Sequence, residues 1–311
     1  MYDTSNFWLQ SERAGTSNLL SHAEPFVKHL TESKKEDGSI CLSGTIGDNY
    51  KVYVSYAGIS LKGSLAKYFL KDNFQTLTRS DSQRAIEMMS DELHLSIDKA
   101  IVRRIDFAQN FIMKYEPETY YNYLGQCPHY KRFMQPNSIY YNNSLKTMIF
   151  YNKMAQGKSK GLIIPEIWHG QNVLRFEMRF EKRVSKQFNM DEINAGILPN
   201  EKFYMELVKR WTQGYEAIDK LHQINLNLSN MKSPKDILKH FALMKINELG
   251  QDNAIQMIED LRAKNTFAHK EYYSRIKAEI KELCKAPDLT TTSELITELD
   301  KKVRAVRRYC R

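Results

Sequence analysis

The chain has 311 residues, of which 42% are hydrophobic and 11% aromatic, and a formal net charge of +9. This composition excludes an intrinsically disordered protein, and the basic balance favours an acidic partner, nucleic acid before an anionic membrane surface. The sequence has no membrane-spanning apolar run, no signal-peptide pattern and no Cys-x-x-Cys pair, so we expect a soluble cytoplasmic protein with reduced thiols and no membrane partner.

Up to about residue 195, strand and helix patterns alternate. The predicted strands are 39–45, 50–56, 58–61, 101–112, 138–141, 146–153 and 172–181. Two turns, Gly47-Asp48-Asn49 and Asn142-Asn143, join neighbouring strands into hairpins. Helices are predicted over 85–97, capped by Ser80 or Asp81, and over 117–124, opened by Pro117. The polar, glycine-bearing segment 155–161 is predicted to be a loop.

Beyond about residue 194, long amphipathic segments predominate. The predicted helices are 200–222, 234–248, 252–265, 269–284 and 292–308. The sequence therefore predicts an α+β protein, with a central antiparallel sheet covered by helices in residues 1–195 and an all-helical C-terminal domain in 196–311. That domain could serve DNA binding, partner binding or assembly, and its basic end, residues 301–311, either binds phosphates or forms a solvated tail.

The strand over 173–181 carries a regular charged face. Charged and apolar residues alternate along it, so a strand would present one charged side and one apolar side. The charged residues are Arg175, Glu177, Arg179 and Glu181. Such a face is most often turned to solvent, where ion pairs contribute little, but interleaved arginines and glutamates also suit phosphate groups and a divalent metal.

Two other predicted strands carry polar residues that can join this face. Arg104 and Asp106 share one side of the strand over 101–112, and Tyr151 and Lys153 share one side of the strand over 146–153. In one sheet, the carboxylates would form a hard oxygen site suited to Mg²⁺ or Mn²⁺. A tyrosine can act as a covalent nucleophile, and a lysine can stabilise its phenolate or the attacked phosphate.

Taken in this order, the segments resemble the filamentous-phage gene II family of replication proteins and the related rolling-circle plasmid initiators. The matching motifs are Arg104-Ile105-Asp106, the segment from Thr147 to Lys153, Arg175-Phe176-Glu177-Met178-Arg179, the block from Ile59 to Phe69 followed by Asn73, and the opening Met1-Tyr2-Asp3-Thr4. The resemblance covers roughly residues 1–190 and implies a nickase domain of the HUH-like endonuclease superfamily.

This resemblance implies a rolling-circle replication initiator that nicks and religates origin DNA. Tyr151 matches the nucleophile that stays linked to the 5′ phosphate, and Lys153 matches the lysine that follows it. The implied ligands of Mg²⁺ or Mn²⁺ are Asp106, Glu177 and, in second place, Glu181; the implied phosphate contacts are Arg104, Arg175 and Arg179. The implied partners are origin DNA, single-stranded or cruciform at the nick site, and a host helicase and polymerase, with a homodimer left open.

Some assignments have alternatives. The His-hydrophobe-His motif of the wider superfamily is absent from the sequence, so the metal site rests on carboxylates, with His169 as the nearest histidine candidate. Tyr140 and Tyr141, on the neighbouring strand, are alternatives to Tyr151 as the nucleophile. A mobilisation relaxase, or a non-catalytic basic protein that binds and regulates an origin, are alternatives to the initiator.

Overall fold

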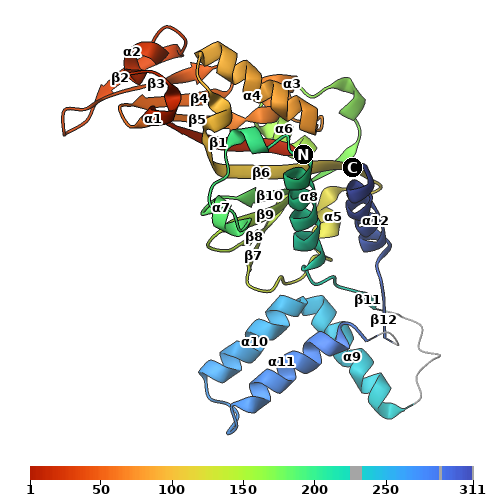
Figure 1. Cartoon of the computed structure of the whole chain (residues 1–311). Helices are drawn as coiled ribbons and strands as arrows, with labels where there is room; N and C mark the ends of the chain where they lie inside the picture. Colours follow the sequence, from red (N-terminus) through yellow and green to blue (C-terminus); the bar gives the residue numbers. More distant parts are fainter. Residues whose placement is uncertain (225–232, 287–288, 310–311) are drawn as a thin grey trace. The chain divides into compact units, whose positions relative to one another are not determined.

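The computed structural model describes residues 1–224, 233–286 and 289–309 (Figure 1). The chain divides into two units, one made of residues 1–117, 129–216 and the C-terminal residues from 303, and the other of residues 118–128 and 217–302. The first unit is built on a sheet with helices, and the second is predominantly helical. This confirms the predicted α+β class with a helical C-terminal region.

Ten antiparallel strands form one sheet in the first unit, in the order β2-β3-β4-β5-β1-β6-β10-β9-β8-β7. The strands are β1 (Tyr2–Gln10), β2 (Lys28–Lys34), β3 (Ile40–Ile46), β4 (Tyr50–Ser55), β5 (Gly58–Ser64), β6 (Ile101–Met113), β7 (Lys131–Gln135), β8 (Ser138–Asn142), β9 (Lys146–Asn152) and β10 (Asn172–Phe180). Every predicted strand is confirmed within a few residues. The two edge strands, β2 and β7, were not predicted, and β1 was expected only over Met1 to Thr4, from the resemblance to the family's first strand.

Short helices connect and cover the strands of this unit. They are α1 (Ser11–Ala14), α2 (Leu19–Ala23), α3 (Leu65–Leu70), α4 (Arg79–Leu93), α6 (Lys153–Ser159), α7 (Val184–Gln187) and α8 (Glu201–Glu216), with 3₁₀ turns η1 (Ile97–Lys99), η2 (Glu166–Trp168) and η3 (Ala195–Ile197). Helix α4 begins earlier than predicted because Thr78 and Asp81 cap it reciprocally, the side chain of each bonding to the backbone N–H of the other.

The prediction of a loop over 155–161 is wrong, because helix α6 occupies most of this segment. The side chain of Asn152 accepts a hydrogen bond from the Ala155 N–H at 3.0 Å and so caps the helix at the end of β9. Gly157 is buried inside the helix, where an added Cβ would lie 3.3 Å from Ile164. The glycine therefore serves close packing here and does not interrupt the helix.

The apolar face of the sheet is covered by α8, which crosses strands β6, β10 and β9 (Figure 1). Phe150 and Phe176 stack with ring centroids 4.2 Å apart, and Trp211 of α8 lies 4.6 Å from Phe176. At Gly214 a Cβ would lie 2.1 Å from Cε of Met178, so glycine is needed for the helix to come this close. Helix α8 ends at Glu216, earlier than the predicted residue 222.

The remaining elements lie in the C-terminal part of the chain, apart from α5. They are α5 (Pro117–Tyr121), α9 (Pro234–Leu249), α10 (Gln251–Ala263), α11 (Glu271–Leu283) and α12 (Glu294–Tyr309). The prediction of an all-helical domain is wrong in one detail, since β11 (Gln223–Ile224) pairs with β12 (Thr290–Thr291). Most of the basic segment 301–311 lies on α12, while residues 310 and 311 lie outside the described residues. No helix in the described ranges has the length and apolar character needed to span a bilayer.

Candidate active site

Cross-strand pairing brings the polar sides of three strands together. Asp106 of β6 lies opposite Arg179 of β10, and Arg175 of β10 lies opposite Tyr151 of β9. Residues that face each other across neighbouring strands point to the same side of a sheet, and alternation adds Glu177 to that side. The charged face that the sequence shows in β10 is therefore shared with Asp106 and Tyr151, on the side of the sheet opposite α8.

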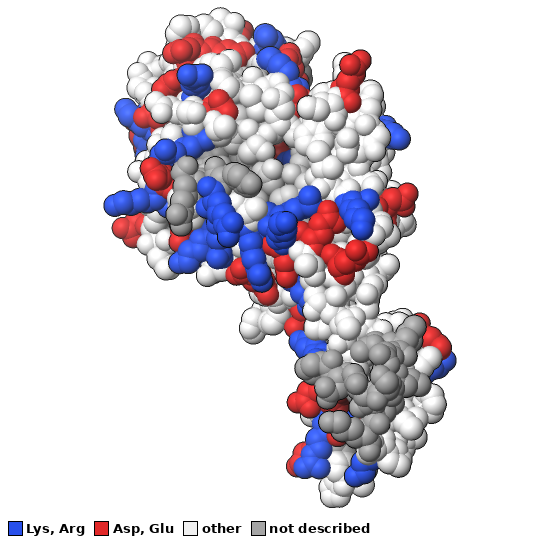
Figure 2. All heavy atoms as spheres, turned by 90° about the vertical axis from the view of Figure 1, so that its right-hand side faces the viewer, with Lys and Arg blue, Asp and Glu red and all other residues white. Residues whose placement is uncertain are grey.

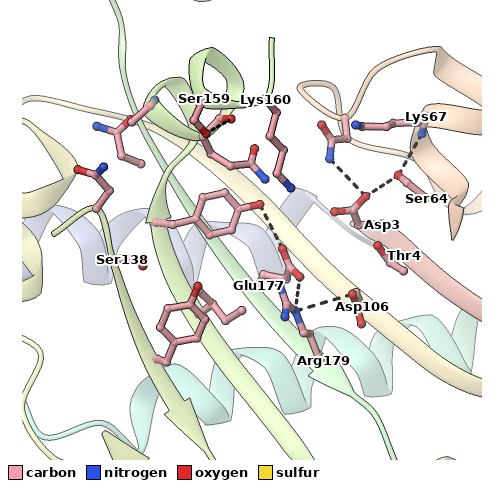
Figure 3. Close-up of a pocket in the computed structure, with 18 of the residues that line it drawn as sticks. Asp3, Thr4, Ser64, Lys67, Asp106, Ser138, Ser159, Lys160, Glu177 and Arg179 are labelled. Carbon is pink, nitrogen blue, oxygen red and sulfur yellow. Dashed lines mark hydrogen bonds and ion pairs between the residues drawn. The ribbon is translucent and has the colours of Figure 1, made fainter. Parts of the chain in front are cut away.

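A cavity of about 560 Å³ opens on this face (Figure 3). Its lining includes Asp3, Asp106, Tyr151, Lys160, Glu177 and Arg179. These side chains come from β1, β6, β9, the end of α6, and β10, so the cavity collects residues that are far apart in the sequence. Lys160 and Lys67 extend into it from two sides, and the carboxylates lie along its floor (Figure 3).

Each of the three buried carboxylates of this face is paired with an arginine. The pairs are Asp3 with Arg175, Asp106 with Arg104, and Glu177 with Arg179. The closest N–O distances are 2.5, 2.7 and 2.7 Å. Buried carboxylates without such partners would cost several kcal/mol each, so the arginines account for the presence of three acids in one face.

Asp106 is the carboxylate whose ionised form is least favoured by its surroundings. It is 1% exposed and accepts two hydrogen bonds of 2.7 Å from Arg104. Burial raises the pKa of Asp106 to about 7; the bonds from Arg104 oppose this rise, and the negative charge of Glu177 adds to it. The Nε atom of Arg179 lies 2.7 Å from Glu177 and 3.8 Å from Asp106, so the two acids share one cation.

Asp3 is a site residue that the sequence analysis did not single out. The register of β1 against β6 shifts between Tyr2 and Ser5, and both Asp3 and Thr4 line the cavity as a result. Burial tends to raise the pKa of Asp3, but the Arg175 charge and a 2.6 Å hydrogen bond from Ser64 outweigh it and hold this pKa at about 2. The signal available in the sequence was the opening segment Met1 to Thr4, which resembles the first strand of the family.

Tyr151 lies on the cavity wall with its hydroxyl pointing to the neighbouring strand. Its OH donates a hydrogen bond of 3.2 Å to Oε2 of Glu177 (Figure 3). Burial raises the pKa of Tyr151 well above its usual value near 10; Arg175 lowers it in part, and Glu177 raises it further. The phenol is thus neutral in the resting protein and has a carboxylate in contact to take its proton.

The side chains of the two alternative tyrosines point to opposite faces of the sheet, because they are neighbours in β8. Tyr140 lies opposite Ile149 and lines the cavity, on the same side of the sheet as Tyr151. Tyr141 lies opposite Met148 and packs against Phe150 on the apolar side. Tyr141 therefore does not reach the cavity, whereas Tyr140 does.

Lys153 and Arg175 lie beneath the cavity wall, outside its lining. Lys153 is the first residue of α6, is completely buried, and donates a 2.7 Å hydrogen bond to Oδ1 of Asn73. Burial lowers the pKa of Lys153 to about 7, Arg175 lowers it too, and Asp3 opposes this. Arg175 donates to Asp3, to Oδ1 of Asn110 and to the Asn73 carbonyl. Both side chains support the wall and hold Asp3 and Asn73 in place.

The remaining candidates lie at the margin of the site. Glu181 is about one-third exposed and contacts Thr147 and Arg104 without lining the cavity. His169 is exposed, and its Nε2 atom lies 3.0 Å from the carbonyl oxygen of Ile164. The structure thus brings Asp106 and Glu177 together, with Glu181 beside Arg104 and His169 apart from the cavity.

The donor set for a metal consists of two carboxylates. The described residues contain no cluster of three or more His, Cys, Asp or Glu side chains arranged to hold an ion. Asp106 and Glu177 both approach Arg179, so the two carboxylates lie close to each other on the same side of the sheet. Mg²⁺ is commonly held by one or two carboxylates together with substrate phosphates and water. These residues fit a Mg²⁺ or Mn²⁺ ion that binds together with a phosphate.

The comparison with protein families gives a match. The family model Phage_CRI, which describes the N-terminal region of a replication-associated protein, matches residues 1–214, about two-thirds of the chain. This range contains the complete ten-stranded sheet, the cavity and α8 up to Gly214. No match is found among curated proteins.

Proposed function

Because the chain belongs to this family of phage replication-associated proteins, we propose that it initiates rolling-circle replication by nicking one DNA strand at an origin and later rejoining it. The observation that carries the proposal is the contact of Tyr151 with Glu177 in a cavity bordered by arginines and lysines. A nucleophile, a base in contact with it and cations for a phosphate are the groups that a tyrosine nickase requires.

In the proposed reaction, the Tyr151 oxygen attacks the phosphorus of one phosphodiester. The Tyr151 proton passes to the Glu177 carboxylate, with which the phenol is already hydrogen bonded. The bond from phosphorus to the 3′ oxygen breaks, so the 5′ phosphate becomes linked to Tyr151 and the 3′ oxygen takes a proton from solvent. The free 3′ hydroxyl is then available to a polymerase, and attack by a 3′ hydroxyl on the phosphotyrosine reverses the step.

The cations of the cavity suit the charge that develops on the phosphate. Arg104 and Arg179 line the cavity and are 23% and 30% exposed, so their guanidinium groups can turn from the carboxylates to a phosphate. Lys160 extends its ammonium group into the same space (Figure 3). Arg175 is buried and paired with Asp3. In this proposal it makes no direct contact with the phosphate and instead holds the residues of the cavity wall in place. A divalent metal held by Asp106 and Glu177 would polarise the phosphoryl oxygen.

A wider basic surface supports the same partner. Lysine and arginine side chains gather in a band on one face of the molecule, with acidic side chains beside them (Figure 2). Basic side chains in such numbers attract the DNA backbone without reading its sequence, and the affinity falls steeply with salt. The +9 net charge of the chain has the same effect over a longer range.

The proposal is tested by trapping the covalent product. The full-length protein is incubated with Mn²⁺ and single-stranded oligonucleotides that tile the DNA flanking its gene, and denaturing gels are examined for protein attached to a 5′ end. The wild-type protein should form the adduct, Tyr151→Phe should lose it, and Tyr140→Phe should keep it. An adduct in Tyr151→Phe would refute the assignment of the nucleophile. DNA binding without cleavage by the wild-type protein would favour a non-catalytic origin-binding protein.

A further inference from the structure

Rows of side chains continue from the cavity across β8 to the edge strand β7. Each row contains residues that lie directly opposite one another in β9, β8 and β7. The rows are Tyr151–Ser138–Gln135, Ile149–Tyr140–Phe133 and Thr147–Asn142–Lys131. Paired residues share a side of the sheet, so all of these side chains belong to the face that holds the cavity. The face that carries the site therefore extends beyond the cavity to the edge of the sheet.

The central row ends in two aromatic rings. Phe133 is 56% exposed, so its ring is accessible to a partner. Its ring lies 6.5 Å from the ring of Tyr140, at an interplanar angle of 47°. Tyr140 lines the cavity, so the pair forms a continuous aromatic surface from the cavity to the edge strand.

The side chains around these rings are basic or neutral. Lys131 lies one row from Phe133 and is exposed, and Gln135, exposed as well, flanks the ring on its other side. Neither β7 nor β8 contains an acidic residue. The exposed ring of Phe133 and the partly exposed ring of Tyr140, bordered by a lysine and amides, match unpaired nucleotides. Bases stack on aromatic rings, and the lysine meets the phosphates.

The surface lies within reach of the scissile bond. Glu177 of β10 lies opposite Ile149 and so extends the row Ile149–Tyr140–Phe133. Neighbouring strands are about 4.8 Å apart, so the backbone of Tyr140 lies about 10 Å and that of Phe133 about 14 Å from the backbone of Glu177. This is a span of a few nucleotides of extended single-stranded DNA. A strand with one phosphate at Tyr151 can therefore place its next bases over Tyr140 and Phe133.

We propose that the outer face of β8 and β7, with Phe133 and Tyr140 as stacking residues and Lys131 as a phosphate contact, binds unpaired bases of the single-stranded DNA that enters the active site. The inference rests on the proposed function, because that function places a DNA strand at Tyr151. It goes beyond it by naming the surface that holds the bases beside the nick.

The test compares two neighbouring residues of one strand. Met134 follows Phe133 in β7, is 46% exposed, and points to the opposite side of the sheet because side chains alternate. Binding of fluorescein-labelled oligo(dT) to the full-length protein is measured by anisotropy at fixed salt, without added metal. Phe133→Ala should weaken binding about 5- to 150-fold, the range found for the loss of one stacked base. Phe133→Tyr and the control Met134→Ala should bind as the wild type does.

A second measurement reports on stacking itself. In Phe133→Trp, the new indole should be quenched when oligo(dT) is added, and in Met134→Trp it should not, after subtraction of the signal from the wild-type protein. Equal oligo(dT) affinity of Phe133→Ala and wild type would overturn the inference. The alternative is that a second copy of this chain occupies the surface, at the exposed β7 edge. Light scattering tests this alternative. If Phe133→Ala converts a dimer into a monomer, the surface is a contact between two copies and the inference is wrong.

These results are independent of cleavage. Loss of oligo(dT) affinity in Phe133→Ala with no covalent adduct in the wild-type protein would support the binding surface and reject the nickase. Adduct formation at Tyr151 with unchanged affinity in Phe133→Ala would support the nickase and reject the surface.

Discussion

Tyr151 donates a hydrogen bond of 3.2 Å to Oε2 of Glu177, from one strand of the sheet to its neighbour. Both side chains are buried, and their backbones are fixed by the β9–β10 ladder. The rigid sheet holds the phenol and the carboxylate in contact before any substrate arrives. Such pre-organisation reduces the cost of assembling the reacting groups.

Glu177→Gln removes the proposed base and keeps the shape of the side chain. We expect adduct formation to slow by about 10²- to 10⁴-fold, the usual contribution of a general base, while oligo(dT) affinity stays within a few-fold of wild type. Single-turnover rates measured over a range of Mn²⁺ concentrations check this. Full rescue of the rate at high Mn²⁺ would mean that the variant is slow only because it binds the metal weakly, and would contradict the role of Glu177 as the base.

Arg175→Met leaves the carboxylate of Asp3 buried without its main partner. Removal of one member of a buried ion pair typically costs about 3–5 kcal/mol, and we expect a loss of this size in the free energy of unfolding. All three tryptophans of the chain lie within residues 1–216, so their fluorescence during urea unfolding reports on the first unit. The double variant Asp3→Asn, Arg175→Met should recover part of the loss; an unchanged stability in Arg175→Met would contradict the pairing.

Asp3 should make the first unit sensitive to acid. Its pKa is about 2 in the folded protein against an ordinary value of 3.8, so the folded state holds the ionised form more tightly than the unfolded state does. The sign follows from proton linkage: the stabilisation is complete above about pH 4 and is lost as the pH falls from about 4 to 2. The loss amounts to about 2 kcal/mol for a shift of this size. The free energy of unfolding of Asp3→Asn, measured with urea, should not show this loss over the same pH range.

Metal binding at Asp106 and Glu177 should stabilise the protein against heat. If Mn²⁺ binds the folded state alone, the free energy of unfolding rises by about 2.7 kcal/mol at a hundred times the dissociation constant. We expect Mn²⁺ to raise the Tm of the wild-type protein and to leave that of Asp106→Asn unchanged. Glu181→Gln is the matched control, because Glu181 lies outside the cavity lining, and it should keep most of the rise. An equal rise in Asp106→Asn would exclude Asp106 as a ligand.

Three of the strands that carry the site, β6, β9 and β10, could be predicted because each has one apolar and one polar side. The alternation in β6, β9 and β10 is imposed by a sheet with α8 on one face and the cavity on the other. The edge strands gave no such signal: all residues of β2 are exposed, and β7 places the apolar Phe133 and Met134 side by side. An edge strand is selected by its backbone pairing, which leaves no trace in hydrophobic periodicity.

The roles of single residues were harder to predict than the strands. Arg175 and Arg179 occupy equivalent positions in the alternation of β10, yet Arg175 is buried against Asn73 and Asp3 while Arg179 lines the cavity. The difference depends on which distant segment covers each end of the strand. The position of Lys153 could not be predicted from the strand pattern either. Asn152 ends the strand and caps helix α6, so Lys153 is the first residue of the helix and is buried in the interior.

The pairing of each buried acid with an arginine has a consequence for the order in which ligands bind. Asp106 and Glu177 are neutralised by Arg104 and Arg179, so a metal alone must compete with the arginines, and a phosphate alone must compete with the carboxylates. If both bind as proposed, the arginines would turn to the phosphate and the acids to the metal, and neither charge would be left without a partner. Each ligand therefore strengthens the binding of the other by the same factor, as thermodynamic linkage requires. We therefore expect the protein to bind free metal weakly and to bind it more tightly when its DNA is present.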